Sequence, residues 1–272
     1  MPGILPYLLV TALLYGALAL TIWRNQKRPV GEHPAAPGWP HYAVLLPLTL
    51  HGILLFQAVF SEYGIYLGVG DALSITAWLA VLIYWFGNFF FNLQGLQALV
   101  VPLAALCSLL PAVFPATHPL LSTGLPAFKA HLLISLLAYG FFTIAALHVV
   151  LMSLLQRKLH GHKLPAFLEN LPPLLTMEML LFRIIGAGFV LLTLTLGSGI
   201  LFSEEMFGRP LQFNHKTLFG FISWIVFAVL LGGRQIYGWR GRIALRWTWG
   251  GLITLLLAYL GTKFVLEIIL HR

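Results

Sequence analysis

The chain has 272 residues, of which 59% are hydrophobic and only 9% are charged. Soluble domains carry about 25% charged residues, so this composition excludes a soluble globular domain and indicates an integral membrane protein. The net charge of +8 would suggest a nucleic-acid partner in a soluble protein, but here the Lys and Arg residues lie in short loops between apolar segments, so we expect the lipid bilayer as partner and no nucleic acid.

Eight apolar segments are long enough to cross a hydrocarbon core about 30 Å thick, and Pro, Gly or charged residues separate them. We expect spans at 4–23, 42–60, 71–88, 95–114, 129–155, 180–202, 215–232 and 247–269. The predicted fold is an all-α polytopic membrane protein, a bundle of about eight transmembrane helices in a single domain over residues 1–272. The first segment has neither a basic leader nor a cleavage site, so we expect it to be retained and not removed as a signal peptide.

The distribution of Lys and Arg predicts the orientation of the spans. Five of the 16 lie on one side, which leaves 11 on the other side, mainly in the loops at 24–41, 156–179 and 233–246. The side rich in positive charge should be cytoplasmic, which puts both termini on the outer, periplasmic side of a bacterial inner membrane. The loop at 156–179 is the longest, and we expect it to contain a short amphipathic helix on the membrane surface.

Ten histidines are unusual in so apolar a chain, and ligand-type side chains within spans indicate functional sites. In chain order, His51 in LTLHGILLF lies near the middle of the second span, and His131 in PAFKAHLLISLLAYGFF opens the fifth. His148 lies about 25 Å further along that helix, where we expect it to pack against neighbouring groups. His215 in QFNHKTLFGF begins the seventh span, and His271 follows the eighth. Solvated loop positions are expected for His33, His41, His118, His160 and His162.

Three of these histidines, His131, His215 and His271, are predicted to converge on the outer face. Haem iron takes axial histidines and an apolar, aromatic surround, whereas zinc more often brings cysteines or carboxylates. We therefore predict His131 and His215 as metal ligands, with His271 and His51 as further cofactor-binding candidates. Each also has a simpler explanation: an interfacial residue, a helix start, a frayed end and an interhelical hydrogen bond, respectively.

Two further patterns concern tryptophans within the spans and small residues near a span end. Trp78, Trp85 and Trp224 could form the wall of a site for a flat ligand, although such residues also anchor spans or pack between them. In TLTLGSGILF, near the outer end of the sixth span, we expect the small residues Gly197 and Gly199 to permit close helix packing.

Three segments in a specific order carry a family resemblance: LPPLLTMEMLLFRIIGAGFVLLTLTLGSGILF, FNHKTLFGFISWIVFAVLL and YGWRGRIALRWTWGGLITLLLAYLGTKFVLE. With them, nearly the whole chain resembles the cytochrome c assembly family of haem-handling membrane proteins, in its short, eight-span branch. The resemblance implies that His131 is an outer haem ligand and that His51 corresponds to a histidine of an early span. His271 lies near an outer histidine of the larger members.

The resemblance implies haem b as cofactor and a role in haem handling or cytochrome c-type biogenesis, with another membrane assembly protein as a partner. The chain also departs from the larger members, because FGRPLQFNHK replaces their tryptophan-rich signature and LLGGRQ lacks their inner histidine. We therefore expect a haem-binding protein that is not an enzyme. The alternatives are a transporter of a small apolar or porphyrin-like solute and a membrane scaffold without haem.

Overall fold

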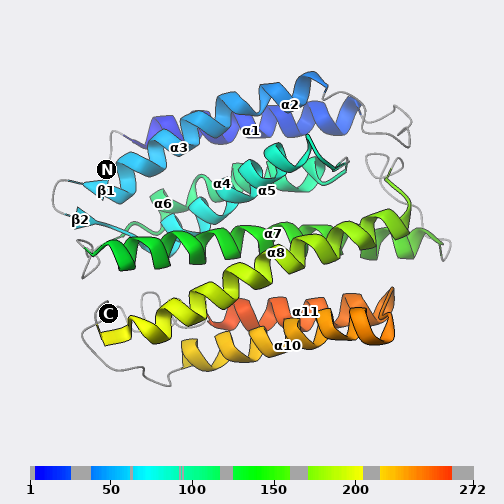
Figure 1. Cartoon of the computed structure of the whole chain (residues 1–272). Helices are drawn as coiled ribbons and strands as arrows, with labels where there is room; N and C mark the ends of the chain where they lie inside the picture. Colours follow the sequence, from blue (N-terminus) through cyan, green and yellow to red (C-terminus); the bar gives the residue numbers. More distant parts are fainter. Residues whose placement is uncertain are drawn as a thin grey trace. The chain divides into compact units, whose positions relative to one another are not determined.

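Figure 1 shows the computed structural model of the chain, in which nearly all regular structure is helical. The structure describes residues 4–25, 38–61, 64–91, 93, 95–116, 125–159, 171–204 and 215–258. The chain divides into two compact units: unit 1 is Met1–Pro119 with Thr143–Leu181, and unit 2 is Leu120–Phe142 with Phe182–Arg272.

Unit 1 is built from the first six helices together with parts of the next two. The six are α1 (Leu5–Asn25), α2 (Trp39–Ala43), α3 (Leu45–Val59), α4 (Val69–Gly87), α5 (Gln97–Cys107) and α6 (Leu110–Val113). The other two are α7 (Pro126–Leu159) and α8 (Leu174–Leu201), each of which contributes one segment to each unit. Within unit 1, α1 packs against α3 and α5, and α4 packs against α3, α5 and α6 (Figure 1).

Two predicted spans, 42–60 and 95–114, are each divided into two helices. The helix breaks at Val44, just before Pro47, and again at Ser108 and Leu109, just before Pro111. Proline lacks a backbone N–H, and its ring clashes with the carbonyl four residues earlier. Those carbonyls belong to Ala43 and Cys107, which are the last residues of α2 and α5.

A short β pairing, not predicted from the sequence, links α3 to α4. Strand β1 (Phe60–Ser61) pairs antiparallel with β2 (Gly64–Ile65). The carboxylate of Asp71 then accepts a hydrogen bond of 3.0 Å from the Gly68 N–H at the start of α4. Such a cap satisfies one of the N–H groups that the first turn of a helix leaves without a partner.

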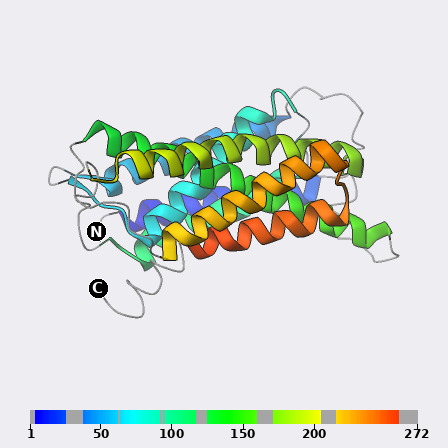
Figure 2. The same ribbon diagram turned by 60° about the horizontal axis from the view of Figure 1, so that its bottom comes forward.

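Unit 2 contains the start of α7, most of α8, α10 (His215–Tyr237) and α11 (Arg242–Leu256). Figure 2 shows α10 and α11 side by side, and the Ser223 hydroxyl of α10 donates a hydrogen bond of 3.0 Å to the Gly251 carbonyl of α11. The turn between them has Gly238 and Gly241 at φ angles of 65° and 57°. These positive values favour glycine, which explains the two glycines of YGWRG.

The predicted fold, a polytopic membrane protein made of helices, is confirmed, whereas the count of eight spans stays a prediction. Among the described residues, six helical segments are long and apolar enough to cross a membrane: Leu5–Arg24, Trp39–Val59, Val69–Gly87, Pro126–Gln156, Leu174–Leu201 and His215–Tyr237. The apolar segment Gln97–Val113 is shorter, and α11 corresponds to the described part of the last predicted span. The described parts of the loop at 156–179 belong to α7 and α8, apart from the non-helical residues 171–173, and residues 160–170 lie outside the described part.

Candidate functional site

His131 lies in the second turn of α7, half-buried against the end of α8 in unit 2. Its Nδ1 is 2.8 Å from the hydroxyl oxygen of Ser198. A Cβ atom added at Gly199 would lie 3.5 Å from His131 Cε1, so the backbone of α8 comes close to the ring. A Cβ at this distance would be in ordinary van der Waals contact, so the predicted role of Gly199 in close packing stays a prediction. A Cβ at Gly197 would meet no atom within 4 Å, so the same prediction is wrong for Gly197.

Two lysines lie at the helix starts of this unit, and one of them acts on the His131 ring. Lys129 is exposed in the first turn of α7, and the ammonium of Lys216 is close enough to act electrostatically on the imidazole. His215 precedes Lys216 as the exposed first residue of α10. Unit 2 thus brings the start of α10 near the start of α7. The pairing of His131 with His215 at one metal stays a prediction, and His271 lies outside the described residues.

His51 is completely buried in unit 1, with 0% of its surface exposed. Its Nε2 is 2.9 Å from the Ser74 hydroxyl of α4, and its ring makes an edge contact with Tyr15, with centroids 5.8 Å apart. Within the described part of the chain, neither His51 Nδ1 nor the Tyr15 hydroxyl has a hydrogen-bond partner. This geometry supports the interhelical hydrogen bond that was one of the two explanations for His51, whereas a role in haem binding stays a prediction.

His148 has the packing role expected from the sequence. It is buried, and its Nε2 donates a hydrogen bond of 2.8 Å to the carbonyl of Met177. Since a carbonyl can only accept, the proton of the neutral ring is on Nε2.

His41 differs from the expectation, because the structure buries it where a solvated loop residue was predicted. Helix α2 begins at Trp39, earlier than the predicted start of the span, so His41 lies on a helix that packs against the end of α4. Its ring stacks on Trp85 at 5.6 Å with 12° between the planes, and its Nδ1 accepts a hydrogen bond of 3.3 Å from the Asn88 amide.

The three tryptophans considered as a wall for a flat ligand all contact other protein groups. Trp78 donates to the Leu48 carbonyl at 2.8 Å, and Trp224 donates to the Thr193 hydroxyl at 2.9 Å. Trp85 is the residue that stacks on His41. These contacts support the packing explanation.

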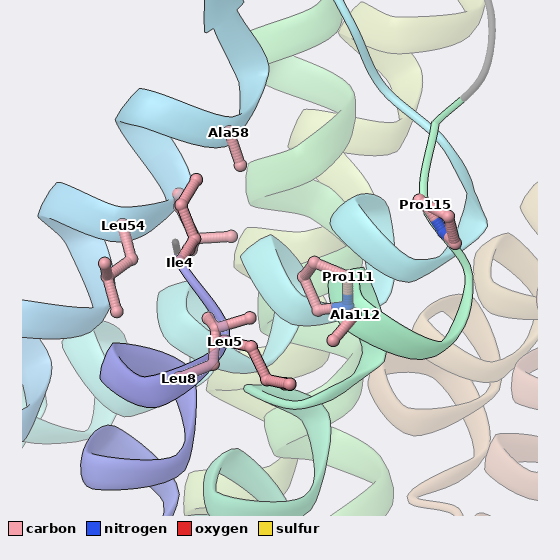
Figure 3. A pocket seen from close by; sticks show the side chains of 9 residues that line it. Ile4, Leu5, Leu8, Leu54, Ala58, Pro111, Ala112 and Pro115 are labelled. Carbon is pink, nitrogen blue, oxygen red and sulfur yellow. The ribbon is translucent and has the colours of Figure 1, made fainter. Parts of the chain in front are cut away.

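A cavity of about 270 Å³ in unit 1 lies between the start of α1, the end of α3 and the region of α6 (Figure 3). Its lining is Ile4, Leu5, Leu8, Leu54, Leu55, Ala58, Pro111, Ala112 and Pro115. All these side chains are apolar, so the cavity offers neither a ligand for iron nor a partner for a carboxylate. It suits hydrocarbon and is not the candidate metal site.

The chemistry that His131 can supply is a single imidazole ligand. Histidines that bind metals almost always use their second ring nitrogen in a hydrogen bond that orients the ring, and Ser198 makes this contact here. Haem iron needs only axial ligands from the protein, because the porphyrin provides the other four. The described ranges contain no group of three or more His, Cys, Asp or Glu side chains that could hold a metal ion. The residues around His131 therefore fit haem.

The chain is similar to a family of cytochrome c assembly proteins and to several of its members. The model of the family described as Cytochrome C assembly protein matches residues 39–270. Inner membrane protein YpjD of Escherichia coli K12 is 35% identical over 144 residues, which are 53% of this chain and 54% of that protein. Cytochrome c biogenesis protein CcsA of Chlamydomonas reinhardtii is 27% identical over 209 residues, which are 72% of this chain and 57% of that protein. The chain thus spans little more than half the length of these relatives, and no solved structure matches it significantly.

Proposed function

Because the chain belongs to the cytochrome c assembly protein family, we propose that it is a haem-binding membrane protein that acts in haem handling or cytochrome c-type biogenesis. The name of the CcsA relative refers to cytochrome c biogenesis, and that of the YpjD relative to the inner membrane. The proposed place of action is the bacterial inner membrane, beside another membrane assembly protein. The proposed role is to bind haem b without catalysing a reaction.

The observation that carries this proposal is the setting of His131. Its Nδ1 forms a hydrogen bond with Ser198. In this proposal Nε2 is the ring nitrogen that binds the iron. Haem b, when bound, supplies an iron that takes imidazole as an axial ligand. Lys129 and Lys216 provide positive charge that suits the two haem carboxylates. His215 is the first candidate for the second axial ligand, and His271 is the next.

The proposed topology puts this site on the outer side of the membrane. It has eight crossings with both termini outside, and the loops richest in Lys and Arg face the cytoplasm. In this arrangement the start of α7, the end of α8 and the start of α10 all lie at the outer surface. Haem bound there would be available to partners on that side.

The test is to purify the full chain, add hemin and record the absorption spectrum in the oxidised and reduced states. We expect a Soret band and sharp α and β bands for the wild type, and loss of most of this signal in His131→Ala. Leu133→Ala is the matched control, because Leu133 is 57% exposed two residues further along the same helix. It should keep the wild-type spectrum.

A wild-type chain that gives no Soret band after addition of hemin would refute the haem proposal. A full signal in His131→Ala would refute the assignment of the ligand. His215→Ala separates the candidates for the second ligand: a five-coordinate, high-spin spectrum identifies His215, and an unchanged spectrum removes it in favour of His271.

A further inference from the structure

We infer that Ser198 is a positioning residue that holds His131 in the tautomer with the proton on Nδ1. The Ser198 hydroxyl makes two hydrogen-bond contacts. Ser198 Oγ is 3.1 Å from the Thr195 carbonyl oxygen, one turn earlier in α8, and 2.8 Å from His131 Nδ1. A serine hydroxyl has one hydrogen, and a carbonyl oxygen can only accept. Both contacts can be hydrogen bonds at the same time only if the hydroxyl donates its hydrogen to Thr195 and accepts from His131.

It follows that His131 Nδ1 carries the hydrogen and donates it to Ser198. A neutral imidazole has one N–H, so Nε2 is then the nitrogen with the lone pair. Iron binds the ring nitrogen that has no proton. An imidazole with its proton on Nε2 would have to lose or move that proton before it could bind iron through Nε2. Ser198 therefore prepares the ring for the ligand role, a conclusion that rests on the proposed function.

The buried histidines His148 and His51 have different hydrogen-bond arrangements. The Nε2 of His148 donates to a backbone carbonyl, which is the opposite tautomer. His51 also meets a serine, but within the described ranges the hydroxyl of Ser74 contacts His51 alone, so its hydrogen is not committed elsewhere. Among the histidines that the structure describes, only His131 combines a serine whose hydrogen is already donated with a ring held through Nδ1.

The backbone of α8 makes the contact well defined. Thr195 accepts through its main-chain carbonyl, so the acceptor is fixed by the helix and not by a mobile side chain. A Cβ atom added at Gly199, the next residue of the same helix, would be in ordinary contact with Cε1 of the ring at 3.5 Å. Hydrogen bonds from serine to the carbonyl three or four residues earlier are a regular feature of helices.

The first test needs no haem. The full chain is labelled with ¹⁵N-histidine, and the two ring nitrogens of His131 are identified by the signals that vanish in His131→Gln. We expect the N–H on Nδ1 in the wild type and in Ser198→Thr, which keeps the hydroxyl. Ser198→Ala should shift the ring to the N–H on Nε2, the form preferred by a free histidine side chain. A wild-type ring with its proton on Nε2, or no change in Ser198→Ala, would overturn the inference.

The second test measures hemin binding by titration of the same variants. We expect Ser198→Ala to weaken binding by about 10-fold to 100-fold, as is typical when the hydrogen-bond partner of a ligand is removed, and Ser198→Thr to restore it. Ser74→Ala is the matched control, since it also removes a contact between serine and histidine, of 2.9 Å, but in unit 1. It should leave hemin affinity unchanged, and an equal loss in both alanine variants would contradict the inference.

The two tests separate the two conclusions. A wild-type chain that binds no hemin would remove the proposed function, while the ¹⁵N measurement would still decide the tautomer. If hemin binds and Ser198→Ala changes neither the tautomer nor the affinity, the proposed function stands and the role of Ser198 falls.

Discussion

His51 and Ser74 connect α3 to α4 through a single hydrogen bond of 2.9 Å inside unit 1. Both side chains have 0% of their surface exposed, so water cannot replace this bond. Hydrogen bonds between transmembrane helices contribute about 0.6 kcal/mol on average and about 1.7 kcal/mol at most. At the scale of the residue, we therefore expect His51 to contribute to stability.

We predict that His51→Leu lowers the free energy of unfolding by about 1–2 kcal/mol, because it removes this bond and leaves the Ser74 hydroxyl buried without it. The haem content should not change. Unfolding in detergent mixtures checks the stability, and a double-mutant cycle with Ser74→Ala isolates the pair, for which we expect a coupling of about 0.6–1.7 kcal/mol. A reduced Soret band in His51→Leu, or two haems per wild-type chain, would instead make His51 a haem ligand.

At the scale of the element, the contact between α10 and α11 depends on a glycine. A Cβ atom added at Gly251 would lie 2.6 Å from Phe227 Cζ, which is closer than such atoms can approach. Phe227 is fully buried and stacks on Phe142 with ring centroids 4.4 Å apart, so its ring has little room to move. The close approach of the two helices therefore requires a residue without a side chain at position 251.

The expected effect of Gly251→Ala is a loss of stability of about 1–3 kcal/mol, the usual cost of overpacking. Gly250→Ala is the control: Gly250 is exposed, and a Cβ there would meet no atom within 4 Å. Alanine should be neutral at that position or stabilise the helix by up to about 1 kcal/mol. Thermal unfolding of the two purified variants measures the difference, and similar melting temperatures would argue against the packing of α10 on α11.

At the scale of the whole molecule, orientation in the membrane follows from charge. We predict that the turn at residue 240 is cytoplasmic, because the loop at 233–246 contains four arginines. Green fluorescent protein fused after residue 240 should fluoresce, whereas alkaline phosphatase fused there should be inactive. Fusions after residue 125, at the start of α7, should give the opposite pattern. An active phosphatase at residue 240 would reverse the topology and move His131 to the cytoplasmic side.

The sequence alone predicted six spans that the described residues form as helices of membrane length, since a membrane crossing is a local property of about 20 consecutive apolar residues. It also indicated the cytochrome c assembly family, which the match over residues 39–270 confirmed. The prediction of continuous helices was wrong near Pro47 and Pro111, where the helices break. The cause is a missing backbone N–H and a clash of the proline ring, both of which can be read from the local sequence. The position of His131 at the start of a span made it a candidate ligand, and its binding of iron stays a prediction.

The partners of the histidines were decided by the tertiary structure. Ser198 is 67 residues from His131, and before the fold was known it was only a small residue between two glycines. The burial of His41 on Trp85 likewise depends on which face of α2 meets α4. In a soluble helix the apolar stripe marks the buried face, but in lipid the outward face is apolar as well. The pattern along a span therefore does not reveal which side chains point inward, and only the packing of the helices determines which hydroxyl meets which imidazole.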